Sequence, residues 1–175
     1  MMDQSREMAR RVEVFEHRSE WAGLYERETR TVSRLLSGQI LQLHHIGSTA
    51  IRGIYAKPII DVMGEVRQIS DIDGFDGRML QGGYRPMGEY GIKGRRFFIK
   101  GSDEARAVHL HLFQQGSAEI AKHLAFRDYL RVKPDVALQY SHLKRQLAAK
   151  HTFDIQAYMD GKDGFIRQVL SELGY

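Results

Sequence analysis

Residues 47–49, Gly47-Ser48-Thr49, have types that suit phosphate chemistry and follow a strand-like run. Free backbone N–H groups at such a turn can face an anion, and the missing side chain of Gly47 lets a phosphate approach closely. The two hydroxyl groups add further donors. The same three residues also suit a helix N-cap after a tight turn, which the spacing alone favours. Both interpretations stay open at this point.

Asp61 lies inside the apolar run 59–63. A carboxylate among such neighbours is partly desolvated and needs a cation, a set of donors or a metal ion. Strand alternation places Asp61, Met63 and Glu65 on one face, with Glu65 about 13 Å away. That separation is too long for one shared ion, so a second ligand has to come from a neighbouring strand. An edge aspartate paired with Lys57 or an arginine is the structural alternative.

His109 and His111 belong to the run Val-His-Leu-His-Leu, residues 108–112. Side chains two positions apart on a strand share a face, with Cα atoms roughly 7 Å apart. Imidazoles in this arrangement can bind a metal ion, a phosphate oxygen or a substrate hydroxyl. His45, next to the glycine-serine pair, is a candidate third member of such a site, or bonds to a backbone carbonyl. We expect Asp61, His109 and His111 to be the catalytic and metal-binding group.

Cationic residues gather in the stretch GIKGRRFFIKG, residues 91–101, which contains no acid. This stretch is a candidate anion-facing strand, and alternation allows only one of Arg95 and Arg96 to face a site. Lys57, before Pro58, is a candidate phosphate ligand or a solvated surface lysine. The net charge of +4 and the pI of about 9.4 favour anionic partners. Long basic tracts are absent, so a nucleic acid stays open as a partner without being indicated.

The composition is that of an ordinary globular protein, with 42% hydrophobic and 27% charged residues in a chain of 175. This length suits one domain with a substantial core. The sequence contains no cysteine, which excludes disulfide scaffolds and thiolate metal sites. Residues 1–15 show no secretion signal, and no run of residues is apolar enough to span a membrane. We therefore predict a cytoplasmic protein; the sequence specifies no oligomeric state.

Hydrophobic periodicity predicts strands with inserted helices in the first two-thirds of the chain, and helices alone after Gly116. The early helices are expected from Ser19 to Gly38 and over 71–82. The expected strands cover 11–17, 39–46, 58–66, 84–90, 95–100 and 107–113, the last three forming an antiparallel meander. Three helices follow over 118–131, 135–150 and 153–173, with Pro134 at a helix boundary.

This order of elements predicts an α+β fold, in which a mixed sheet carries packed helices. We expect a single domain over residues 1–175. Its sheet-containing core covers about 11–115, and a helical lobe over about 118–173 forms one wall of a cleft.

Four segments together resemble the GrpB family, which is placed in the nucleotidyltransferase superfamily with the polymerase-beta-like fold. They are HIGSTAIRGIYAKPIIDVMGEV, GYRPMGEYGIKGRRFFIKG, VHLHLF and KHLAFRDYLRVKPDVALQYSHLKRQLA, and the resemblance runs from about Val12 to Leu170. It implies a nucleotidyltransferase-like sheet and a C-terminal helical lobe. It also implies that Gly47-Ser48 and Asp61 match the glycine-serine pair and the first acid of the superfamily. The position of the second acid holds Met63, and the strand of the third carries the two histidines.

Three functions follow as hypotheses. The first is a metal-dependent nucleotidyltransferase that binds a nucleoside triphosphate and Mg²⁺, with Mn²⁺ or Zn²⁺ as alternatives, and transfers a nucleotidyl group to an acceptor. Its phosphates would contact Gly47, Ser48, Thr49, Lys57, His45 and Arg95 or Arg96. The second is a non-catalytic module that binds a nucleotide or another phosphorylated small molecule. The third is a metal-dependent hydrolase with a centre made of His45, Asp61, His109 and His111.

Overall fold

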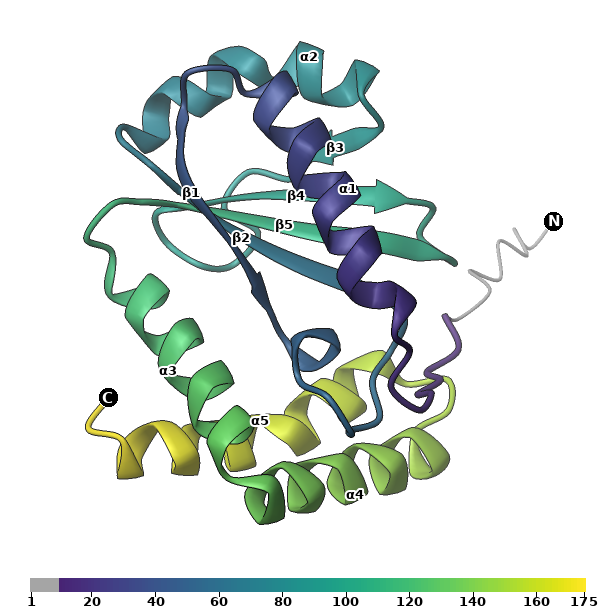
Figure 1. Cartoon of the computed structure of the whole chain (residues 1–175). Helices are drawn as coiled ribbons and strands as arrows, with labels where there is room; N and C mark the ends of the chain where they lie inside the picture. The colour runs from purple at the N-terminus through teal and green to yellow at the C-terminus, as the bar shows by residue number, and fades with distance from the viewer. Residues whose placement is uncertain (1–9) are drawn as a thin grey trace, which may run out of the picture.

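A five-stranded mixed sheet lies at the centre of the molecule, with the strand order β1-β2-β5-β4-β3 (Figure 1). The computed structural model describes residues 10–175. Among the described strands, β2 and β5 are the parallel pair, and all other neighbours are antiparallel. The strands are β1 (Ile40–Ile46), β2 (Ile60–Val66), β3 (Tyr84–Pro86), β4 (Arg95–Gly101) and β5 (Arg106–Gln114).

Helices pack on this sheet, so the predicted α+β fold class is confirmed. The α-helices are α1 (Glu20–Leu35), α2 (Asp76–Gln81), α3 (Ala118–Val132), α4 (Pro134–Lys150) and α5 (Ile155–Glu172). Two 3₁₀ helices complete the elements: η1 (Ser48–Ala50) and η2 (Ile69–Phe75).

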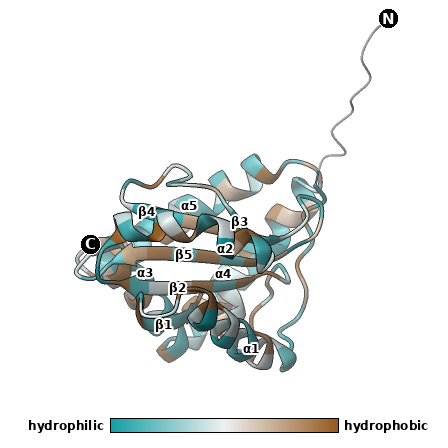
Figure 2. Ribbon diagram, turned by 90° about the horizontal axis from the view of Figure 1, so that it is seen from above, coloured by the Kyte–Doolittle hydropathy of each residue, from teal (hydrophilic) through white to brown (hydrophobic). Residues whose placement is uncertain are grey.

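Helices α1 and α2 cover one face of the sheet. Trp21 and Val32 of α1 pack against inward-facing strand residues such as Val62 and Leu110, and together they form the largest buried apolar cluster. Figure 2 shows apolar β5 residues at the centre of the molecule, between helices with hydrophilic outer turns. Because strand side chains alternate, the residues between these core positions point to the other face, which carries Asp61.

Helices α3, α4 and α5 gather on the side of the molecule away from α2 (Figure 1). The Ser117 side chain accepts a hydrogen bond from the backbone N–H of Glu119 and caps α3. Pro134 is the first residue of α4, where its missing N–H costs no helical hydrogen bond. Ile120 of α3 packs against Met63 and Phe113, so α3 covers part of the face that carries Asp61.

Three sequence predictions differ from the structure. Residues 11–17 form no strand; a single bridge joins Phe15 to Ala56, because the backbone of this segment pairs with separate parts of the chain. The helix expected over 71–82 is divided into η2 and α2. The strand expected over 84–90 ends at Pro86, and residues 87–94 form a loop.

No helix within residues 10–175 combines the length and the apolar character needed to cross a membrane.

Candidate functional site

A cavity of about 520 Å³ opens between the sheet and the helices α4 and α5. The sheet contributes Asp61 from β2, Arg95 from β4, and His109 and His111 from β5. Ser48, Thr49 and Lys57 come from the segments before β2. The cavity therefore joins most of the residues that the sequence singled out, from segments far apart in the chain.

The parallel pairing of β2 with β5 places Asp61 directly beside His109 and Met63 beside His111. Oδ1 of Asp61 lies 3.0 Å from Nε2 of His111 and 3.6 Å from Nδ1 of His109. Burial acts to raise the pKa of Asp61, but its contacts with the two imidazoles outweigh this and hold the pKa well below its ordinary value. The carboxylate is thus ionised at neutral pH.

The proton position on His111 follows from its two neighbours. Nη1 of Arg95 lies 3.2 Å from Nδ1 of His111, and a guanidinium can only donate. Nδ1 of His111 therefore accepts, and the proton on Nε2 is donated to Asp61. Burial and the nearby guanidinium lower the pKa of His111, against the effect of the carboxylate. We assign His111 as the neutral Nε2–H tautomer.

The turn at Gly47 lies against the same carboxylate. Gly47 has a φ of 70°, in the region that favours glycine, and a β-carbon there would lie 2.6 Å from Oδ2 of Asp61. Ser48 and Thr49 follow as the first residues of η1 and line the cavity. A tight turn after β1 therefore brings two hydroxyl-bearing residues next to the acid.

His45 lies on the other face of the sheet. It pairs in register with Val62, its ring stacks on Tyr25 at 4.6 Å, and it is not part of the cavity lining. Nε2 of His45 lies 2.9 Å from Oγ1 of Thr49, and burial lowers its pKa to about 4. The expected grouping of His45 with the other two histidines is therefore not found, because strand alternation directs it toward α1.

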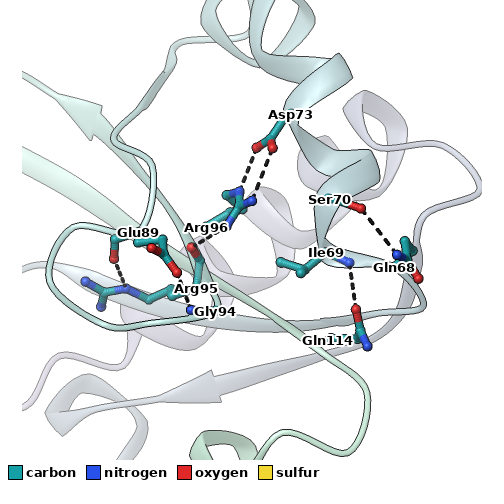
Figure 3. A network of polar contacts seen from close by, with 9 residues as sticks. All are labelled: Gln68, Ile69, Ser70, Asp73, Glu89, Gly94, Arg95, Arg96 and Gln114. Atoms are coloured by element: carbon teal, nitrogen blue, oxygen red, sulfur yellow. Dashed lines mark hydrogen bonds and ion pairs between the residues drawn. The ribbon is translucent and has the colours of Figure 1, made fainter.

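Of the two neighbouring arginines, Arg95 faces the cavity and Arg96 does not. Arg96 makes two hydrogen bonds with the carboxylate of Asp73, at 2.6 and 3.1 Å, and so joins β4 to η2 (Figure 3). Arg95 donates from Nε to the carbonyl of Glu89 and from Nη2 to that of Tyr90. Its Nη1 contacts His111, so each guanidinium nitrogen of Arg95 already has a partner.

Four cationic residues of the cavity were not singled out from the sequence: Arg10, Arg106, Lys144 and Lys162. Nζ of Lys162 lies 4.8 Å from the centre of the Tyr158 ring, and Nζ of Lys57 lies 5.1 Å from the same centre. Nζ of Lys144 donates to the carbonyl of Tyr55. Lys57 and Lys162, which both contact the ring of Tyr158, therefore line the same cavity as the buried Lys144.

Burial and like charges lower the pKa values of these lysines. The pKa is about 7 for Lys57 and about 6 for Lys144, in each case mainly because of burial and then because of Lys162. Burial also lowers the pKa of Lys162 to about 8. A bound anion would stabilise the charged form of these lysines, because it offsets both their lost hydration and their mutual repulsion.

A signal for two of these lysines was present in the sequence. Lys144 follows Tyr140 by four residues, so it shares the buried face of α4. Lys162 follows Tyr158 by the same step in α5. A lysine four residues after an apolar position of the same helix face is the feature that could have identified Lys144 and Lys162.

The donor set does not fit the metal site of a carboxylate-based nucleotidyltransferase. Magnesium prefers oxygen ligands, whereas the cavity offers Asp61 alone as a carboxylate, and Met63 in the second position is fully buried. Nε2 of His111 carries a proton and so is not a free ligand. In the described part of the chain, no group of three or more histidine or acidic residues is arranged to hold an ion.

Two relatives match nearly the whole chain. The UPF0157 protein YqkA of Bacillus subtilis (strain 168) is 44% identical over 158 residues, which are 90% of this chain and 46% of that protein. The chain therefore spans about half the length of YqkA. The crystal structure of the conserved protein GrpB from Enterococcus faecalis has a TM-score of 0.87 and 39% identity, covering 91% of this chain and 96% of that one.

A more distant similarity shows the fold. The crystal structure of the Cid1 poly(U) polymerase has a TM-score of 0.51 at 10% identity, over 78% of this chain and 43% of that one. The fold predicted from the resemblance, a nucleotidyltransferase-like sheet with packed helices, is therefore confirmed. Residues 11–172 match the family described as GrpB protein. The chain belongs to the GrpB family.

Proposed function

We propose that the chain binds a nucleoside triphosphate in the cavity, with the phosphates at its cationic end. The charge of the cavity lining carries this proposal. Asp61 is the one carboxylate among the lining residues, all of which lie within residues 10–175. Six cationic side chains face it across the same space: Arg10, Lys57, Arg95, Arg106, Lys144 and Lys162.

The phosphates are assigned to the lysines rather than to Arg95. Nitrogen atoms of Arg95 are engaged by two carbonyls and by His111. Lys57 and Lys162 also line the cavity, and the contact of each ammonium group with the ring of Tyr158 takes up no backbone carbonyl. A triphosphate accepts several charge-assisted hydrogen bonds, which are about twice as strong as neutral ones.

Nucleotidyl transfer is the second candidate. The contact of the Gly47 turn with Asp61, in a fold shared with Cid1 poly(U) polymerase, favours it. In this reaction an acceptor oxygen attacks the α-phosphorus of the nucleotide, the bond to the β-phosphate oxygen breaks, and pyrophosphate leaves. Because the donor set does not fit a resident metal centre, Mg²⁺ enters this proposal as part of the magnesium–nucleotide substrate.

Calorimetric titration with each of the four common nucleoside triphosphates, with and without Mg²⁺, tests the first candidate. We expect the double variant Lys57→Gln/Lys162→Gln to bind at least about tenfold more weakly than the wild type. Lys150→Gln, at an exposed position at the end of α4, is the matched control. Equal affinity of the double variant and the control would contradict the assignment.

Transfer of an α-³²P label to added acceptors separates the two candidates. If the chain transfers nucleotides, label transfer should be lost in Asp61→Asn while nucleotide binding persists. Binding without transfer in the wild type leaves the chain as a binding module. The proposed cytoplasmic location stays a prediction.

A further inference from the structure

The loop formed by residues 87–94 borders the cavity and carries Tyr90 at its centre. Among residues 10–175, Tyr90 is the non-glycine residue with a positive φ, 49°. This conformation is sterically disfavoured for a residue with a β-carbon. The side chain is nevertheless a large aromatic one that stays 50% exposed, where a glycine would relieve the strain. Strain of this kind is concentrated at functional sites.

The loop is held by a buried arginine. Arg95 is 6% exposed and donates to the carbonyl of Glu89 at 3.1 Å (Figure 3). It also donates to the carbonyl of Tyr90 at 2.7 Å. The carboxylate of Glu89 closes the loop by accepting from the backbone N–H of Gly94. Because Arg95 also contacts His111, the tyrosine and the centre of the cavity are fixed relative to one another.

One face of the Tyr90 ring is covered. The ring stacks on Phe97 with a centroid distance of 5.1 Å and an angle of 15°. Tyr90 lines the cavity and is half exposed, so its other face is free to receive a planar group. Ile92 of the same loop also lines the cavity and adds an apolar side chain beside Tyr90 in the chain.

We propose that the free face of Tyr90 is the platform for the base of a nucleotide. The inference rests on the proposed function and deepens it, because it assigns the residue that recognises the base and so distinguishes a nucleotide from an inorganic polyphosphate or a sugar phosphate. The phosphates contact the lysine end of the same cavity. Base stacking on an aromatic side chain tolerates all bases, so Tyr90 selects for a base without selecting which one.

The test compares ATP with inorganic tripolyphosphate by calorimetry, for the wild type, Tyr90→Ala and Tyr90→Phe. We expect Tyr90→Ala to bind ATP about ten- to a hundredfold more weakly, with tripolyphosphate affinity unchanged. Tyr90→Phe, which keeps the ring, should retain the affinity for ATP. Tyr175→Ala removes another half-exposed tyrosine outside the cavity lining and serves as the control.

Equal loss of both ligands in Tyr90→Ala would show a general effect of the loop and would overturn the platform. Unchanged ATP affinity in Tyr90→Ala would overturn it as well, and would leave the phosphate site intact. Failure of the wild type to bind either ligand would instead refute the proposed function, and the platform with it. The affinities for ATP and tripolyphosphate, compared in the wild type and in Tyr90→Ala, therefore show whether the stacking role of Tyr90 or the proposed phosphate site is refuted.

Discussion

Nε2 of His111 lies 3.0 Å from Oδ1 of Asp61, although 50 residues separate them in the chain. They come from β5 and β2, the parallel pair of the described sheet. Because Arg95 occupies the other ring nitrogen of His111, the imidazole donates to the carboxylate and stays neutral. In this arrangement His111 positions Asp61, and the proton on Nε2 keeps that nitrogen from coordinating a metal ion.

The first prediction concerns the proton on His111. In ¹⁵N NMR spectra, we expect the Nε2–H tautomer and a pKa below the ordinary value of 6.5. Arg95→Met removes a like charge and the donor to Nδ1, so the pKa of His111 should rise. Arg96→Met is the matched control, since Arg96 pairs with Asp73 outside the cavity lining. A similar rise in both variants would contradict the assigned contact.

The second prediction concerns the stability of the protein as a function of pH. Lys144 is 1% exposed and has a pKa of about 6, against an ordinary value of 10.5 for lysine. Between these values the unfolded state binds more protons, so this residue makes the free energy of unfolding rise with pH. The full contribution is at most about 1.4 kcal/mol per pH unit.

Lys144→Met should therefore flatten the dependence of the unfolding free energy on pH between about 6 and 9. Urea titrations at several pH values measure this slope. An unchanged slope would mean that Lys144 keeps its proton in the folded protein.

The third prediction links ligand binding to proton uptake. At pH 8, Lys57 and Lys162 are partly neutral, because their pKa values are about 7 and 8. A bound triphosphate raises these pKa values, so protons are taken up and affinity should fall as the pH rises from 6.5 to 9. Calorimetry in two buffers of different ionisation enthalpy measures the uptake. The variant Lys57→Met/Lys162→Met should lose most of it.

The fourth prediction concerns Met63, whose position the resemblance to nucleotidyltransferases matches with an acid. Its side chain is fully buried and packs with Ile46, Phe113 and Ile120. Met63→Asp should destabilise the protein by roughly 3–5 kcal/mol, because it places an unpaired carboxyl group in an apolar cluster. Met63→Leu should cost less than about 1.5 kcal/mol. Chemical denaturation compares the two; a mild effect of the aspartate would show that this cluster admits a charge.

The sequence predicted which residues of the two central strands share a face of the sheet. The apolar run around Asp61 and the alternation around His109 identify two buried strands with polar residues on one face, and these strands prove to be neighbours. For these two strands, alternation was enough to predict which residues lie on the same face. The face of His45 stayed open, because it depends on the register of β1 with β2, which the sequence does not specify.

The cationic side of the cavity was harder to predict. Lys144 and Lys162 belong to helices that follow the sheet in the chain, and their approach to Lys57 depends on how α4 and α5 pack. Periodicity shows which face of a helix is buried, but it does not show what that face meets. The role of Arg95 was also not predictable, because its partners include backbone carbonyls of a loop.

Gly47 offers a way to disturb the acid without altering any charge. A methyl group at this position would lie too close to Oδ2 of Asp61. The backbone conformation there also disfavours any residue other than glycine. Displacing the carboxylate by a fraction of an ångström would alter its hydrogen bond with His111 without removing any ionisable group. Gly47→Ala thus disturbs the centre by steric and backbone strain rather than by a change of charge, which complements neutralising the aspartate itself.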